Sequence, residues 1–154
     1  MANENSVSVE RWIEMCKNGS TVPVKTYIDG NSMEPLIRKN KNSVTIIPAG
    51  KKIFAGNIVL FKSGGKYILH RVIRVDGDTV NTCGDNCIFP DKPLKKNDIC
   101  GIAVSVEKYG LKLNLDCKIQ YFYGKIWHLF FRKYYTEYRK IRNKLHFLIK
   151  NKGN

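Results

Sequence analysis

Four residues in this sequence have catalytic potential: a serine after a turn, a histidine inside an apolar run and two aspartates in one loop. Ser32 follows a Gly-Asn turn and precedes Pro35, which a first helical turn tolerates because the missing N–H would be unpaired there. Backbone N–H groups at and after Ser32 would then point outward, where they could stabilise a developing negative charge. This geometry suits a nucleophilic serine, but the stretch alone favours an N-capping serine, so the rest of the chain has to decide between them.

A serine hydroxyl needs a base to take its proton, and His70 is the best placed of the three histidines. It lies in Tyr-Ile-Leu-His-Arg-Val-Ile at residues 67–73, where strand alternation puts it on one face with Ile68 and Val72. Apolar surroundings would keep the imidazole neutral, as a general base requires. The alternative is a core histidine with one satisfied hydrogen bond.

A carboxylate that orients the histidine and stabilises its charged form would complete the set. The candidates are Asp85, in Gly-Asp-Asn at residues 84–86, and Asp91 six residues later. Gly-Asp-Asn is also a common turn sequence, so the loop alone leaves both meanings open.

Taken together and in order, these stretches resemble the type I signal peptidases. The residues that carry the resemblance are Gly-Asn-Ser-Met-Glu-Pro at 30–35, Leu-His-Arg-Val-Ile at 69–73, and Gly-Asp-Asn at 84–86 followed by Asp91. The similarity is to the archaeal and endoplasmic-reticulum branch, which uses Ser-His-Asp. The bacterial branch and the related self-cleaving SOS and phage repressors have Lys at the histidine position. The resemblance extends over residues 22–108.

The resemblance implies a serine endopeptidase that cleaves an extended segment of a peptide or precursor protein, such as a leader or signal-like peptide. Ser32 would be the nucleophile, His70 the general base and Asp91 the triad aspartate. Asp85 would lie next to the site, and substrate would add as a strand beside residues 22–28. The matching positions that would wall the substrate pockets are Ile28, Met33 and Leu69.

Two departures from the family bear on this function. Many members carry Ser two residues before the nucleophile, where this chain has Gly30, so the oxyanion would depend mainly on backbone donors such as the Ser32 N–H. The family's N-terminal membrane anchor and a secretory signal are also missing, so we expect a cytoplasmic protein that binds membranes only peripherally. The alternatives are a non-catalytic peptide-binding module, a repressor-like self-cleaving regulatory domain and a membrane-surface adaptor.

Short strand-like runs between closely spaced turns predict a mainly β (α+β) fold of antiparallel strands rather than βαβ units. The expected strands lie at residues 22–28, 43–48, 57–62, 66–76, 78–83 and 98–108. Ser8 would cap a short N-terminal helix that ends before Gly19. We assign residues 1–117 to a signal-peptidase-like peptidase domain and residues 118–154 to a basic amphipathic helical tail.

The basic character of the chain lies mainly in this tail. Residues 118–154 hold ten Lys or Arg against one acid, a charge of +9, and since the whole chain is +14, residues 1–117 carry +5. Apolar residues spaced 4, 3, 4, 3, 4 and 3 apart indicate an amphipathic helix. They are Trp127, Phe131, Tyr134, Tyr138, Ile141, Leu145 and Leu148. Such a helix would bind an anionic membrane or pack on the β domain; nucleic acid is disfavoured because the aromatics are not interleaved with the basic residues.

Five cysteines without paired short spacing argue against a disulfide framework and favour a reducing compartment. Cys83 and Cys87 are spaced like one half of a zinc site, but the sequence has no second short pair. We therefore expect neither a metal nor another cofactor.

Overall fold

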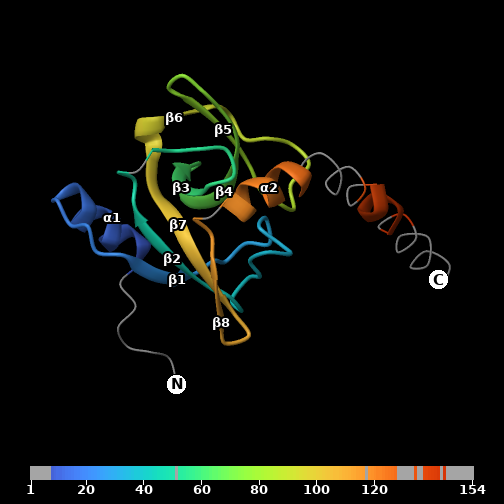
Figure 1. The fold of residues 1–154 in the computed structure, drawn as a ribbon, viewed down its shortest axis with the longest axis horizontal. Coiled ribbons are helices and arrows are strands. Elements are labelled where there is room, and N and C mark those ends of the chain that lie inside the picture. The colour runs from blue at the N-terminus through green and yellow to red at the C-terminus, as the bar shows by residue number, and fades with distance from the viewer. Residues whose placement is uncertain are drawn as a thin grey trace.

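The computed structural model describes residues 8–50, 52–116, 118–127, 134, 137–142 and 144. These residues form one curled antiparallel sheet with short helices against it (Figure 1). The strands are β1 (Val24–Tyr27), β2 (Ser43–Pro48), β3 (Ile58–Ser63), β4 (Lys66–Asp76), β5 (Thr79–Cys83), β6 (Leu94–Lys95), β7 (Ile99–Lys108) and β8 (Leu111–Asn114). Their order is β1-β2-β7-β3-β4-β5-β6, and β8 pairs with β7. The predicted mainly β fold is confirmed.

The N-terminal helix, α1 (Val9–Lys17), forms as its sequence predicts. Ser8 Oγ caps it by accepting a backbone N–H from the first turn at 3.2 Å, and Gly19 follows it with a φ of 90°. On its inner face Trp12 packs closely against Gly101, where a Cβ would lie 2.9 Å from the indole ring. Glycine in β7 therefore lets the helix approach the sheet.

The predicted strands differ from the observed ones mainly at their ends. The strand expected at residues 22–28 is shorter, because only Val24–Tyr27 pair with β2 and Val22 is 60% exposed. The short strands β6 and β8 were not predicted at all. β6 has two residues and β8 has four, too few for a clear strand pattern, so the position of each depends on the longer strand beside it.

Two stretches of open sheet edge run near each other. Among the strands of the described residues, β1 stands at the end of the order and pairs with β2 alone. Residues 66–70 of β4 pair only with β3 within the described chain, because β5 begins to pair at Arg71. Both stretches therefore carry backbone donors and acceptors that could bind an added strand.

The second helix, α2 (Lys118–Ile126), lies across β4 (Figure 1). A Cβ at Gly124 would lie 2.8 Å from Cδ of Arg71, so the glycine permits this close contact. The Tyr123 ring stacks over the same side chain, with its centroid 5.3 Å from the guanidinium carbon. No helix among the described residues combines the length and apolar character needed to cross a bilayer.

The predicted apolar stripe of the tail is only partly described. Tyr134, Tyr138 and Ile141 are helical and exposed. The stripe positions outside the described residues are Phe131, Leu145 and Leu148.

Candidate active site

The centre of the site is a histidine–carboxylate pair contributed by β4 and the loop after β5. His70 Nδ1 donates to Asp91 Oδ2 at 2.7 Å, and the Thr82 hydroxyl donates to the same oxygen at 2.7 Å. A backbone bond from Asp91 N to Thr82 O, 2.9 Å long, holds the loop against β5. Since Nδ1 carries the proton in this bond, Nε2 of a neutral His70 is left as the acceptor.

Both members of the pair favour their charged forms. Burial lowers the pKa of His70, but hydrogen bonds with Asp91 and Cys87 outweigh burial and raise it to about 9. Burial raises the pKa of Asp91, but hydrogen bonds from His70 and Thr82 outweigh it and hold this pKa below its usual range. The sequence-based expectation that apolar surroundings keep His70 neutral is therefore wrong, because the adjacent carboxylate dominates.

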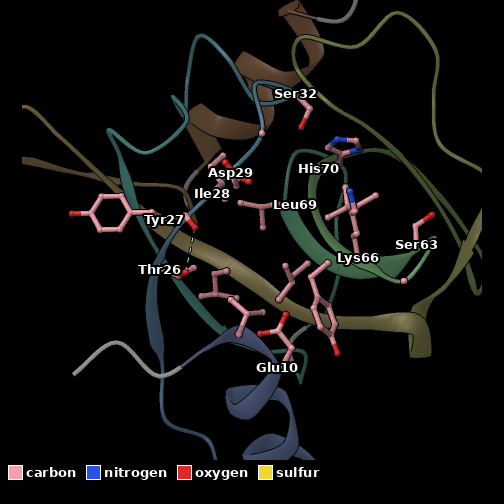
Figure 2. A pocket seen from close by; sticks show the side chains of 17 residues that line it. Glu10, Thr26, Tyr27, Ile28, Asp29, Ser32, Ser63, Lys66, Leu69 and His70 are labelled. Atoms are coloured by element: carbon pink, nitrogen blue, oxygen red, sulfur yellow. Dashed lines mark hydrogen bonds between the residues drawn. The ribbon is translucent and has the colours of Figure 1, made fainter. Parts of the chain in front are cut away.

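Ser32 lies near His70, at one end of a groove of about 760 Å³ (Figure 2). The groove runs between the open edges of β1 and β4, and Glu10 of α1 lies toward its other end. Ser32 stands in hydrogen-bonded turns rather than in a helix, with Ile37 N donating to Met33 O at 2.9 Å. This bond spans four residues, as in one turn of an α-helix, so a short helical turn follows Ser32 as predicted, without growing into a longer helix.

The Gly-Asp-Asn loop contacts the serine loop directly. Asn86 N donates to Ser32 O at 2.7 Å, and its Nδ2 donates to Asn31 O at 3.0 Å. A Cβ at Gly84 would lie 2.7 Å from Ser32 O and 3.0 Å from His70 Nε2. Glycine at this position allows the two loops to meet, and the asparagine fixes the backbone of the serine.

Asp85, between Gly84 and Asn86, forms a buried ion pair with Arg71 instead of contacting His70. Its carboxylate accepts two hydrogen bonds from Arg71, at 2.8 Å from Nε and 2.7 Å from Nη2, and both side chains are fully buried. Arg71 Nη1 also donates to Gly56 O at 3.0 Å. Because His70 and Arg71 are neighbours in one strand, they point to opposite faces, one toward Asp91 and the other toward Asp85.

The C-terminal segment supports this loop from outside. Trp127 Nε1 donates to Asp85 O at 2.8 Å, and Arg139 donates to Asn86 O at 3.3 Å. The Tyr123 and Trp127 rings are stacked, with centroids 5.8 Å apart. A continuous set of contacts therefore leads from α2 through the loop to the backbone of Ser32.

The other predicted site residues divide into two groups. Ile28 and Leu69 line the groove beside Ser32, as expected of pocket walls. Met33 does not line it, because the turns after Ser32 direct this side chain into the core, where it is fully buried. The groove therefore gives no support to the prediction of Met33 as a pocket wall.

Sequence reasoning missed three residues of the site: Arg71, Thr82 and Cys87. One signal for Arg71 was available, namely a charged residue within an otherwise apolar strand. The other two contacts depend on strand register and loop path, which the local sequence does not reveal. Among the residues with described positions, no three His, Cys, Asp or Glu side chains are grouped to hold a metal.

Comparison with known protein families identifies the family of this chain. The family model described as Peptidase S24-like matches residues 7–105, which is well over half of the sequence and includes Ser32, His70 and Asp91. A search of curated proteins found no similar sequence. The chain therefore belongs to the Peptidase S24-like family, within the superfamily of signal-peptidase-like serine peptidases.

Proposed function

We propose that this protein is a serine endopeptidase of signal peptidase type, acting on an extended peptide segment. The observation that carries the proposal is the Asp91–His70 pair at the end of a groove that also holds Ser32. Family membership supports serine peptidase chemistry in general.

In the proposed mechanism, Asp91 keeps the proton of neutral His70 on Nδ1, so that Nε2 accepts the hydroxyl proton of Ser32. The serine oxygen attacks the scissile carbonyl, and the backbone N–H of Ser32 donates to the resulting oxyanion. The imidazolium then gives its proton to the leaving amine, and a water molecule hydrolyses the acyl-enzyme. Gly30 provides no hydroxyl, so backbone donors carry most of the oxyanion stabilisation.

The substrate in this proposal is an extended segment between β1 and residues 66–70 of β4. An added strand could use the backbone groups of both open edges, while alternate side chains enter the apolar walls at Ile28 and Leu69. A leader or signal-like segment of a precursor fits this mode, because it is extended and rich in small and apolar residues.

Labelling with a fluorophosphonate, which reacts with activated serines, tests the proposal without a known substrate. Wild-type protein should be labelled at Ser32, and Ser32→Ala should lose labelling by a factor of about 10⁴ or more. Ser63→Ala is the matched control, because Ser63 lines the same groove and should be dispensable. Labelling that survives in Ser32→Ala would contradict the assigned nucleophile, and a wild type that never reacts would favour a non-catalytic binding module.

A self-cleaving regulatory domain is a second candidate, because family membership is compatible with it. Intact mass measured during prolonged incubation distinguishes the two functions. An endopeptidase acting on other chains should keep its mass, whereas Ser32-dependent fragments at a rate independent of protein concentration would favour self-cleavage.

Labelling should increase as pH rises. A pKa of about 9 leaves roughly 1% of His70 neutral at pH 7, and only the neutral form accepts the serine proton. The rate should therefore rise about tenfold per pH unit between about pH 6 and 8 and level off above about pH 9. A rate that falls as pH rises through this range would contradict a histidine base.

We also propose that the C-terminal segment binds an anionic membrane surface. Residues 118–154 carry +9, and the outer face of α2 exposes Ile119, Phe122 and Ile126 at helical spacing. Deleting the segment would uncover the buried Arg71, so point changes test the proposal better. The double variant Phe122→Ser and Ile126→Ser should lose co-sedimentation with phosphatidylserine vesicles, whereas Leu111→Ser, exposed on β8, should retain it. Equal vesicle binding by the wild type, the double variant and Leu111→Ser would contradict membrane docking through α2.

A further inference from the structure

The imidazole of His70 has a second neighbour that the mechanism does not use. Nδ1 is occupied by Asp91, and the Cys87 thiol is among the groups that raise the pKa of His70, so it lies close to the ring. The crowding at Gly84 agrees with this arrangement, because a Cβ there would lie 2.7 Å from Cys87 Sγ and 3.0 Å from Nε2. The thiol therefore lies on the side of the ring from which Ser32 must be reached.

The position of this thiol is fixed by its loop. Cys87 N donates to Gly84 O at 2.9 Å, closing a turn. The single thiol proton of Cys83 has two carbonyl oxygens within reach, Phe89 O at 3.3 Å and Cys87 O at 3.8 Å. The turn and the Cys83 thiol keep the Cys87 backbone close to the end of β5.

We propose that the Cys87 thiol is a positioning residue that competes with Ser32 for Nε2 of His70 and restrains the base. The inference rests on the proposed function of this site. When His70 is protonated, Nε2–H donates to Sγ, and this bond stabilises the imidazolium, which cannot accept a proton from serine. When Ser32 binds Nε2 instead, the thiol must give up the contact. The two partners therefore act in opposite directions on the availability of the base.

Within the part of the chain that the structure describes, the neighbours of His70 include few other groups that could produce the same effect. Asp91 is the charged group in contact, and it also favours the protonated ring. From β3, Phe61 presents an aromatic ring at a centroid distance of 6.1 Å and carries no titratable group. Lys66 lines the groove on the same strand as His70. Changing Cys87 leaves Asp91, Phe61 and Lys66 in place, so its own contribution can be measured.

The first test is the titration of His70, followed by NMR of the imidazole signals and assigned with His70→Gln. The midpoint in Cys87→Ala should fall by about one pH unit relative to wild type. Cys100→Ala, a partly buried cysteine on β7, is the matched control and should leave the midpoint unchanged. An unchanged midpoint in Cys87→Ala would overturn the proposal.

The second test is the rate of fluorophosphonate labelling of Ser32. At pH 7 Cys87→Ala should react up to about tenfold faster than wild type, with its pH profile displaced to lower pH by the same amount. A purely structural role for Cys87 predicts the opposite, slower labelling at every pH with an unmoved midpoint, and would overturn the inference. If no variant is labelled at any pH, the proposed function fails, while the NMR titration still decides whether the thiol holds the ring.

A reversible adduct provides a third readout. Methyl methanethiolsulfonate converts the thiol to a methyl disulfide, with methanesulfinate as the leaving group, and so places a methylthio group beside Nε2. Wild-type labelling should drop and recover after dithiothreitol, whereas Cys87→Ala should be unaffected. Full labelling of Ser32 in protein whose Cys87 is shown by mass spectrometry to carry the adduct would contradict the competition.

Discussion

Replacing Asp91 with Asn should lower the rate of Ser32-dependent cleavage or labelling by about four orders of magnitude. Asp91 Oδ2 accepts the Nδ1 proton of His70 at 2.7 Å, which leaves Nε2 free of a proton in the neutral ring. An amide at this position can donate its N–H to Nδ1 and so favour the other tautomer, in which Nε2 is protonated and cannot act as a base. The ring would remain in place and the catalytic step would fail.

The same change should also alter the titration of His70. Contact with the Asp91 carboxylate raises the pKa of this histidine, so its removal should shift the residual pH profile to lower pH. Asp78→Asn is the matched control, because Asp78 is exposed in the turn between β4 and β5 and should leave both rate and profile unchanged. Asp91→Asn protein that keeps more than a tenth of wild-type labelling at its optimum would remove Asp91 from the catalytic group.

The order of these residues along the chain made much of the site predictable. Taken singly, each of these residues has an ordinary structural explanation: a serine after a turn, a histidine in a strand and an aspartate in a following loop. Their combination favours catalysis. The structure brings His70 and Asp91 into contact and places Ser32 at the same end of the groove. What their order could not reveal is Cys87, whose position depends on the path of the loop after β5.

The fold was predictable where local chemistry decides it. The Gly64-Gly65 turn joins β3 and β4 because both glycines adopt positive φ, and Ser8 caps α1 as its sequence indicates. The placement of β7 between β2 and β3 was not predictable, because β7 lies far from both in sequence. Its position depends on the packing of two apolar clusters, and neither cluster is a local property of any strand.

The packing of α2 on the buried Arg71 was not predictable. The sequence indicated a helical tail from residue 118 whose apolar stripe begins at Trp127, but it did not show that α2 covers Arg71 with Tyr123 and Gly124. The sequence of a strand that contains an arginine reveals neither the carboxylate that pairs with it nor the side chains that bury it. The helix thus helps to exclude water from a charge that the sheet alone would leave open.

Removing one partner of the Arg71–Asp85 pair should have the largest effect on stability. Asp85→Ala should lower the free energy of unfolding by about 3–5 kcal/mol, because it leaves the buried guanidinium of Arg71 without its carboxylate partner. Urea unfolding followed by circular dichroism measures this change. The exposed Arg74–Asp76 pair is the matched control, with a similar distance of 2.8 Å, and Asp76→Ala should cost less than about 1 kcal/mol.

A double variant distinguishes the effect of the unpaired Arg71 charge from the effect of the lost Asp85 side-chain volume. Arg71→Met combined with Asp85→Ala removes both charges together, so it should recover part of the stability that Asp85→Ala loses. It should not restore labelling of Ser32, because the Asp85 loop positions Asn86, whose N–H holds Ser32 O at 2.7 Å. If Asp85→Ala unfolds no more easily than Asp76→Ala, the ion pair is not what holds this loop. The bonds of Asn86 to the serine loop and the contacts from Trp127 and Arg139 would then support it instead.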